Sequence, residues 1–103
     1  MKTNEYMEQT EQYVLHTYNR FPLVIDHGEG VHLYDTDGKA YLDFAAGIAV
    51  YARGYSNDDY KKAVKDQVDK VIHVSNLFYN VPMGSAAEKL AKASGMDKVF
   101  FTN

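Results

Sequence analysis

The residues of this chain that could carry acid–base or metal chemistry are its histidines and a group of aspartates near one predicted hairpin. The histidines are His16, His27, His32 and His73. They show neither the HxH nor the HxxxH spacing of a metal site, so the sequence predicts no metal ligands. The aspartates are Asp26, Asp35, Asp37 and Asp43. Aspartate is common at turns and strand ends, and no nucleophile motif accompanies this group, so the sequence assigns no catalytic residue.

Two glycines before the hairpin raise the question of a phosphate site. Gly28 and Gly30 flank Glu29, which gives a GxG pattern. The third glycine of a dinucleotide fingerprint is absent, as are the long strand before it and the helix after it. We therefore interpret these glycines as turn residues.

Two further segments each allow two interpretations. Residues 45–54 are small and apolar, neither helical nor alternating in pattern, and either pack closely against neighbouring helices or form a wall of a ligand site. Residues 73–82 form a loop rich in aromatic and hydrogen-bonding side chains, which either binds a partner or fills a crevice. Spacing alone does not decide between these alternatives.

Composition narrows the class of protein. The chain has 103 residues, 46% of them hydrophobic and 24% charged, with a formal net charge of −3 and no cysteine. The interspersed charges favour neither nucleic acid nor a membrane surface as partner, and the lack of cysteine excludes disulfides and thiolate metal sites. No apolar run approaches the roughly 20 residues of a transmembrane helix. We expect one small cytoplasmic domain.

Local patterns predict an α+β fold. A loose apolar stripe predicts a helix over 4–18, capped by Thr3 or Asn4, and an extended piece over 23–26 follows. Alternating segments at 31–35 and 41–44, joined by a turn with Asp37-Gly38, predict an antiparallel hairpin.

The second half of the chain predicts two more helices and a strand. One helix spans about 56–72 and opens on a capping-box pattern at Ser56 and Asp59. The other opens on a similar pattern at Ser85 and Glu88 and ends at Gly95. The continuous apolar run at 98–102 is typical of a central strand of a parallel sheet, yet no partner strand follows it.

Several separately spaced motifs carry a resemblance to a known family. GEGVHLYDTDGKAYLDF, AGIAV, SNLFYN and DKVFFTN follow one another over about 15–103. This succession closely resembles the opening part of class III, fold type I, pyridoxal-phosphate-dependent aminotransferases. The resemblance implies that residues 1–80 form an N-terminal helix, a small antiparallel sheet and a helix, and that 81–103 begin a large cofactor-binding domain that is absent here.

The resemblance also implies an activity for the parent enzyme and the absence of that activity from these 103 residues alone. Transamination needs a lysine for the Schiff base, a carboxylate opposite the pyridine nitrogen and an arginine for the substrate carboxylate. In the family these residues lie downstream, as does a Ser-Gly-x-Glu-Ala stretch whose helix N-terminus holds the cofactor phosphate. We therefore expect pyridoxal 5'-phosphate in the parent enzyme, no cofactor-binding residue in these 103 residues, and no transamination by them alone.

Some positions match the family closely enough to carry a role. Gly47 and Ile48 correspond to a substrate-facing turn, and Tyr18 to an aromatic residue near the substrate entrance. A loop near the dimer interface and active site corresponds to Ser75, Asn76 and Tyr79.

The chain departs from the family at two places. Tyr51 replaces a residue that is usually smaller or polar, and residues 55–58 stand where the family has a His-x-His-Pro helix start. These departures affect the expected local geometry more than the family assignment.

Two classes of function follow. The first is part of a homo-oligomeric enzyme that moves an amino group between a small amino acid and a 2-oxo acid; enzymes for ornithine and for 4-aminobutyrate share this opening, so the donor is not decided. The second is a non-catalytic assembly or interaction module that kept this segment alone.

Overall fold

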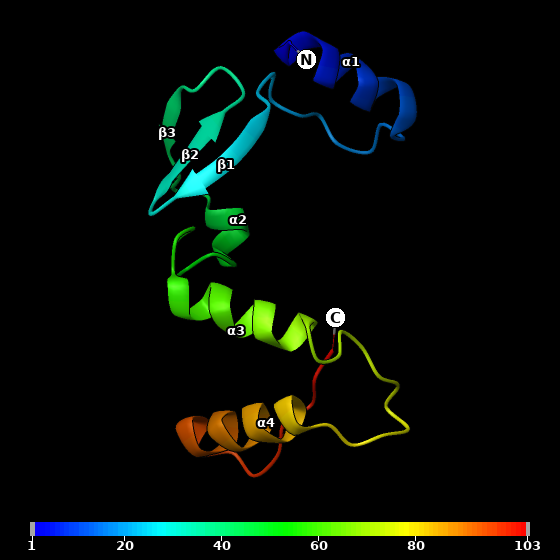
Figure 1. Cartoon of the computed structure of the whole chain (residues 1–103), viewed down its shortest axis with the longest axis vertical. Coiled ribbons are helices and arrows are strands. Elements are labelled where there is room, and N and C mark those ends of the chain that lie inside the picture. The colour runs from blue at the N-terminus through cyan, green and yellow to red at the C-terminus, as the bar shows by residue number, and fades with distance from the viewer. Residues whose placement is uncertain (1, 103) are drawn as a thin grey trace. The chain divides into compact units, whose positions relative to one another are not determined.

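The computed structural model describes residues 2–102 and has an α+β architecture, as the sequence predicts (Figure 1). The helices and strands, in chain order, are α1 (Thr3–Tyr13), β1 (Ile25–Glu29), β2 (His32–Asp35), β3 (Ala40–Leu42), α2 (Ala46–Ala49), α3 (Asp58–Val68) and α4 (Val81–Ser94). The chain divides into two compact units, Met1–Ala63 and Val64–Asn103.

Helix α1 is shorter than predicted and is capped differently. It ends at Tyr13, because Val14 adopts an extended conformation with φ −108° and ψ 127°. The first turn is closed by Glu5, whose carboxylate accepts a hydrogen bond from the backbone N–H of Lys2 at 2.9 Å. Thr3 does not cap the helix; its hydroxyl instead donates to Oδ2 of Asp37 at 2.9 Å, which ties α1 to the hairpin turn.

The sheet has three antiparallel strands in the order β1-β2-β3. The predicted hairpin is confirmed: β2 pairs with β3, and Leu33 lies opposite Tyr41. Gly38, with φ 82°, supplies the left-handed residue that the turn between them needs. The predicted extended piece is strand β1, which continues further than expected, through Gly28 and Glu29. Gly28 therefore lies in a strand and not in a turn.

The two longer helices of the second half are confirmed, but their caps are not the predicted ones. Asn57 caps α3, since its Oδ1 accepts from the N–H of Tyr60 at 2.8 Å. Asn80 caps α4 in the same way, accepting from the N–H of Met83 at 2.9 Å. Helix α4 thus begins four residues before Ser85, because a proline in the first turn, here Pro82, is compatible with a helix start. It ends at Gly95, as predicted, with φ 73°.

The final strand predicted at 98–102 is wrong for this structure. Residues 98–102 have no regular secondary structure, and Phe100 is 89% exposed. A strand exists only where a neighbour completes its hydrogen bonds, and within residues 2–102 the only sheet is β1-β2-β3. The apolar run is present, but nothing pairs with it.

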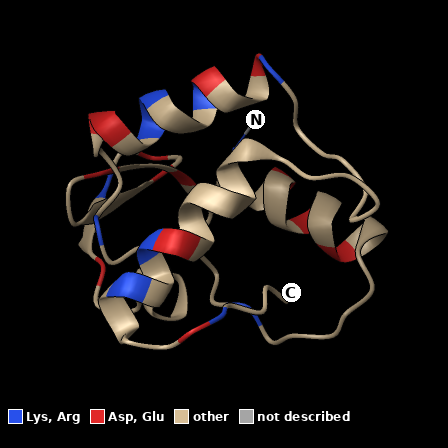
Figure 2. Cartoon of the chain, turned by 90° about the horizontal axis from the view of Figure 1, so that it is seen from below, with Lys and Arg blue, Asp and Glu red and all other residues tan. Residues whose placement is uncertain are grey.

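Apolar side chains are poorly covered throughout. No hydrophobic residue in the described part of the chain is fully buried, and the one buried residue there is Asp35, at 8% exposure. Acidic and basic residues are interspersed along α3 and α4, whereas the charged residues of α1 are all acidic (Figure 2). Within residues 2–102, none of the helices combines the length and the apolar character needed to cross a membrane.

Candidate functional site

The segment after the hairpin, α2, is a left-handed turn. Ala46, Gly47, Ile48 and Ala49 all have positive φ, with values of 47°, 60°, 62° and 63°. An L-residue with a side chain pays about 1–2 kcal/mol for this conformation, and three of these four carry a Cβ. Such strain persists only where the surroundings hold it, and it is concentrated at functional sites.

Asp43 holds the start of this turn. Its Oδ1 accepts hydrogen bonds from the backbone N–H groups of Ala45 at 2.9 Å and Ala46 at 3.0 Å. Its Oδ2 accepts from the hydroxyl of Tyr55. The Tyr55 hydroxyl, followed by the two N–H groups, stabilises the carboxylate and lowers the pKa of Asp43; the same bond raises the pKa of Tyr55.

Tyr55 is in turn fixed against Gly28 of strand β1 and Gly30 of the turn that follows this strand. A Cβ at Gly28 would lie 2.5 Å from Cγ of Tyr55, so only glycine leaves room for the ring. The N–H of Tyr55 donates to the carbonyl of Gly30 at 2.8 Å, and the N–H of Gly30 donates to Oγ of Ser56 at 2.8 Å. The GxG pattern therefore serves chain packing, which supports the interpretation that it is not a phosphate fingerprint.

The turn presents its apolar side chains to solvent. Ile48 is 92% exposed and Val50 78% exposed. Of the two interpretations of residues 45–54, close packing therefore finds no support at Ile48 and Val50, whereas at Gly54 a Cβ would lie 2.6 Å from the carbonyl oxygen of Gly30. The pair Gly47 and Ile48 lies at the tip of the turn.

Tyr18 lies apart from this turn in the chain. It belongs to the irregular segment between α1 and β1, is 72% exposed, and makes no recorded hydrogen bond or ring contact within residues 2–102. The structure does not bring it to Gly47 and Ile48. Its role as a substrate-facing residue stays a prediction.

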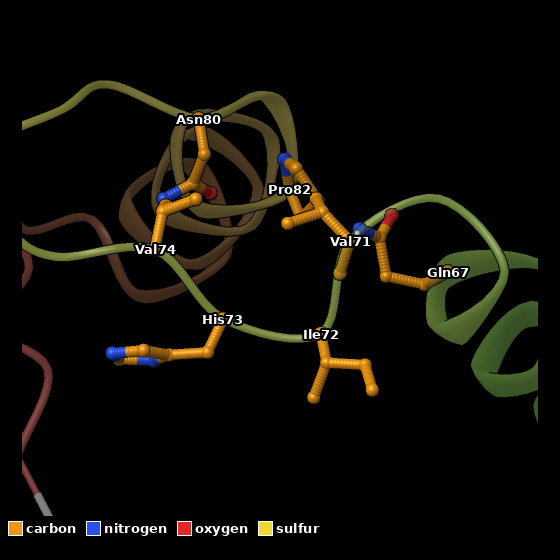
Figure 3. Close-up of a pocket in the computed structure, with 7 residues that line it drawn as sticks. All are labelled: Gln67, Val71, Ile72, His73, Val74, Asn80 and Pro82. Carbon is orange, nitrogen blue, oxygen red and sulfur yellow. Dashed lines mark hydrogen bonds between the residues drawn. The ribbon is translucent and has the colours of Figure 1, made fainter.

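The loop that contains Ser75, Asn76 and Tyr79 lies in the second unit, next to a cavity of about 210 Å³ (Figure 3). The cavity is lined by residues before and after the loop tip, including Gln67, Val71, His73, Val74, Asn80 and Pro82. Ser75 serves the loop itself, since its Oγ accepts from the N–H of Leu77 at 3.2 Å. Asn76 is exposed and Tyr79 is 100% exposed. The role of these three residues near an interface or active site stays a prediction.

The expectation that the residues of this chain bind no cofactor stays a prediction. A Schiff-base lysine needs an enclosing pocket, whereas every lysine within residues 2–102 is exposed. A phosphate needs free N–H groups at a helix N-terminus. Asn57 and Asn80 each accept from one such N–H, in α3 and α4, and the first turn of α3 carries Asp58 and Asp59. Nor do three or more histidine, aspartate or glutamate side chains converge in this part of the chain.

Sequence reasoning missed the pairing of Asp43 with Tyr55. The aspartate was interpreted as a strand-end residue, and its partner lies 12 residues away across an irregular segment. A local signal existed, because an aspartate two residues before a turn commonly accepts backbone hydrogen bonds. The Tyr55 contact depends on the fold and has no signature in spacing.

Comparison with known proteins finds aminotransferases both among family models and among similar sequences. The family model described as "Aminotransferase class-III" matches residues 13–103. Acetylornithine aminotransferase of Archaeoglobus fulgidus is 43% identical over 96% of this chain, and its namesake from Methanocaldococcus jannaschii is 40% identical over 100%. The chain spans about a quarter (26%) of the length of each of these relatives.

Solved structures agree with this. Ornithine δ-aminotransferase of Plasmodium falciparum superposes with a TM-score of 0.95 at 28% identity, over 100% of this chain and 27% of that chain. Acetylornithine aminotransferase of Elizabethkingia anophelis superposes with a TM-score of 0.90 at 32% identity, over 95% of this chain and 26% of that one.

Proposed function

Because this chain belongs to the class-III aminotransferase family, we propose that it forms the N-terminal part of an enzyme that transfers an amino group from N-acetylornithine to 2-oxoglutarate. This reaction would serve arginine biosynthesis. The names of the similar curated proteins support the choice of donor. Since the chain covers about a quarter of these proteins (26%, 26% and 22%), the reaction is proposed for the whole protein.

The observation that carries the choice of donor is the exposed apolar side chain of Ile48 on the left-handed turn. Ornithine carries a charged α-ammonium group, whereas N-acetylornithine carries a neutral acetamido group at the same place. Contact with an apolar side chain removes water from either group, and this costs much more for the charge. We propose that Gly47 and Ile48 face the substrate, as the resemblance of this segment to the family implies, and that Ile48 thereby favours the acetylated donor.

For the cofactor, we propose that the whole protein uses pyridoxal 5'-phosphate, which supplies the electron sink for amino transfer. The residues described here would hold none of it covalently, because their lysines are exposed. Their contribution would be a wall of the substrate site. On this view residues 1–80 belong to an N-terminal portion and 81–103 lead into the large domain.

We further propose a homo-oligomer in the cytoplasm, with Ser75, Asn76 and Tyr79 near the subunit interface and Tyr18 near the substrate entrance. The large exposed apolar side chains support an assembly, among them Leu77 at 87%, Tyr79 at 100% and Val81 at 81% exposure. In the whole protein such a surface would be covered by the rest of the chain or by a second copy, and for this loop we propose the second copy.

Two alternatives have support of their own. The superposition with ornithine δ-aminotransferase favours a related ω-amino donor, ornithine or 4-aminobutyrate, on the same fold. The exposed loop around Tyr79 favours a non-catalytic assembly module. Reading the coding sequence past codon 103 separates these classes: a Ser-Gly-x-Glu-Ala stretch and a later lysine favour an enzyme, and an immediate stop codon favours the module.

The activity test uses the product of the complete coding sequence, loaded with pyridoxal phosphate. We expect 2-oxoglutarate-dependent consumption of N-acetylornithine with a kcat/KM well above that for ornithine and 4-aminobutyrate. A preference for either of the latter would contradict the proposed donor.

A second experiment mixes the 103-residue chain with pyridoxal phosphate, and we expect no lysine-dependent absorbance band. Such a band would contradict the proposal that these residues lack the Schiff-base lysine.

A further inference from the structure

The left-handed turn at 46–49 has only a few supports in the part of the chain that the structure describes. Three residues with side chains stand there at positive φ, and Ile48, at its tip, is 92% exposed. Packing of the tip therefore does not hold the conformation. Backbone hydrogen bonds hold the turn from within, since the N–H groups of Ile48 and Ala49 donate to the carbonyl of Ala45 at 2.8 and 3.1 Å. The side-chain support acts at the start of the turn.

At the first end, both oxygens of Asp43 are engaged. Oδ1 accepts from the N–H groups of Ala45 and Ala46, and Oδ2 accepts from the hydroxyl of Tyr55. Hydrogen bonds to a charged group are stronger than those between neutral groups, and the bond from Tyr55 joins residues 12 positions apart in the chain. The carboxylate thus joins the start of the turn to the segment that leads into α3.

Tyr55, the partner of Asp43 in this bond, is itself held by three contacts. Its N–H is bonded to the carbonyl of Gly30 at 2.8 Å, and its ring occupies the space beside Gly28. The ring also stacks on Tyr51, with centroids 4.8 Å apart. Strand β1 therefore fixes Tyr55, Tyr55 fixes Asp43, and Asp43 fixes the turn.

We propose that Asp43 and Tyr55 are positioning residues that set where Gly47 and Ile48 stand and thereby determine the affinity for the amino donor. This inference rests on the proposed function, because it assumes that the turn faces the substrate. Neither side chain is proposed to touch the substrate or the cofactor. Their effect passes through the turn backbone.

The test compares two tyrosines that stack on each other. Tyr55→Phe removes the hydroxyl that bonds Asp43, whereas Tyr51→Phe removes a hydroxyl that makes no recorded hydrogen bond in the described residues. In the complete enzyme, we expect Tyr55→Phe to raise KM for the amino donor about threefold to tenfold while kcat changes less than about twofold. Tyr51→Phe should leave both parameters unchanged.

A second readout does not depend on activity. Amide hydrogen exchange at Ala45 and Ala46 should become about tenfold faster in Tyr55→Phe and stay unchanged in Tyr51→Phe. Asp43→Asn should act in the same direction, and adding Tyr55→Phe to it should have little further effect, because the two residues act as one unit.

The outcomes separate the two proposals. If the wild-type enzyme does not transaminate, the proposed function fails, and the exchange rates still decide whether the pair holds the turn. If Tyr55→Phe leaves KM and exchange unchanged, or lowers kcat as much as it raises KM, the positioning role is wrong. Additive effects of the two substitutions would equally overturn it.

Discussion

The hydroxyl of Tyr41 donates a hydrogen bond to Oδ2 of Asp35 at 2.8 Å, across the turn that joins β2 to β3. The other oxygen of Asp35 accepts from the N–H groups of Lys39 at 2.8 Å and Asp37 at 3.0 Å. A buried carboxylate is costly unless it is hydrogen-bonded, and Asp35 is fully bonded. The Asp-Thr-Asp-Gly turn is thus closed around a charge.

We expect Tyr41→Phe to raise the titration midpoint of Asp35. The N–H of Lys39 is the largest cause of the lowered pKa of Asp35, and the Tyr41 hydroxyl and Asp37 N–H add to it. Because the pKa is lower in the folded chain than its usual 3.8, the stabilisation is present above pH 3.8 and is lost as the pH falls through the folded value. Carboxyl-carbon NMR titration measures the midpoint.

The matched control for this titration is Tyr34→Phe. Tyr34 stacks on His27, but its hydroxyl makes no recorded hydrogen bond within residues 2–102. The Asp35 midpoint should be the same in this variant as in the wild-type chain. An equal shift in both variants would show that the Tyr41 hydroxyl is not the cause.

His16 should lose a link between α1 and the following segment as the pH rises. Its Nδ1 lies 2.9 Å from a carboxylate oxygen of Glu11, and its Nε2 lies 3.1 Å from Oδ1 of Asn19. Glu11, followed by Asn19, raises the pKa of His16 above 6.5, and Arg20 opposes this. The link is therefore fully present below pH 6.5 and is lost as the pH rises through the raised value.

Imidazole NMR titration checks this prediction. Glu11→Gln should lower the midpoint of His16, because it removes the carboxylate that stabilises the imidazolium. Glu8→Gln, on an exposed glutamate of the same helix, should leave the midpoint unchanged. An unchanged midpoint in Glu11→Gln would rule out the proposed contact.

Two glycine-to-alanine substitutions should act in opposite directions. Gly28→Ala places a Cβ 2.5 Å from Cγ of Tyr55 and should destabilise the contact between β1 and residue 55. In helix α4, the Cβ of Gly84→Ala meets nothing within 4 Å, and alanine is about 0.5–1 kcal/mol better than glycine in a helix. Circular dichroism should show more helix for Gly84→Ala, and amide exchange at Tyr55 should accelerate for Gly28→Ala only.

The hairpin and the helix positions could be predicted from the sequence because their causes are local. Asp37-Gly38 specifies a turn, and alternation specifies the strands that flank it. The exact caps were missed because several polar residues compete for each one: Ser56 bonds Gly30 instead of capping α3, and this choice depends on strand β1.

The left-handed turn could not be predicted from local sequence preferences. Ala46, Ile48 and Ala49 disfavour positive φ, so their own preferences argue against the observed conformation. The contacts of Asp43 oppose those preferences, and one of them comes from Tyr55, whose ring lies beside Gly28 of strand β1. The strand expected at 98–102 failed for a related reason, since pairing depends on a neighbour and not on the segment itself.

Asn80→Ala should shorten or weaken helix α4. The side chain of Asn80 accepts from the N–H of Met83 at 2.9 Å, and losing such a cap costs about 1 kcal/mol. Helical circular dichroism should fall, and exchange at Met83 should accelerate. Asn76→Ala, on an exposed asparagine of the same loop, is the control and should leave α4 unchanged. Unchanged exchange at Met83 in Asn80→Ala would contradict the cap.

Ile48→Asp should shift the donor preference of the complete enzyme from N-acetylornithine toward ornithine. The turn places residue 48 at φ 62°, a conformation that aspartate tolerates better than isoleucine, so the substitution should keep the backbone. A carboxylate there would attract the α-ammonium of ornithine and would face the neutral acetamido group without gain. We expect the ratio of kcat/KM for the two donors to change by about tenfold or more.

Val50→Asp is the control, because Val50 is also exposed, at 78%, but lies outside the left-handed turn. If Val50→Asp shifts the ratio as much, or if Ile48→Asp leaves it unchanged, residue 48 does not select the donor, and the substrate-facing assignment of this turn is wrong.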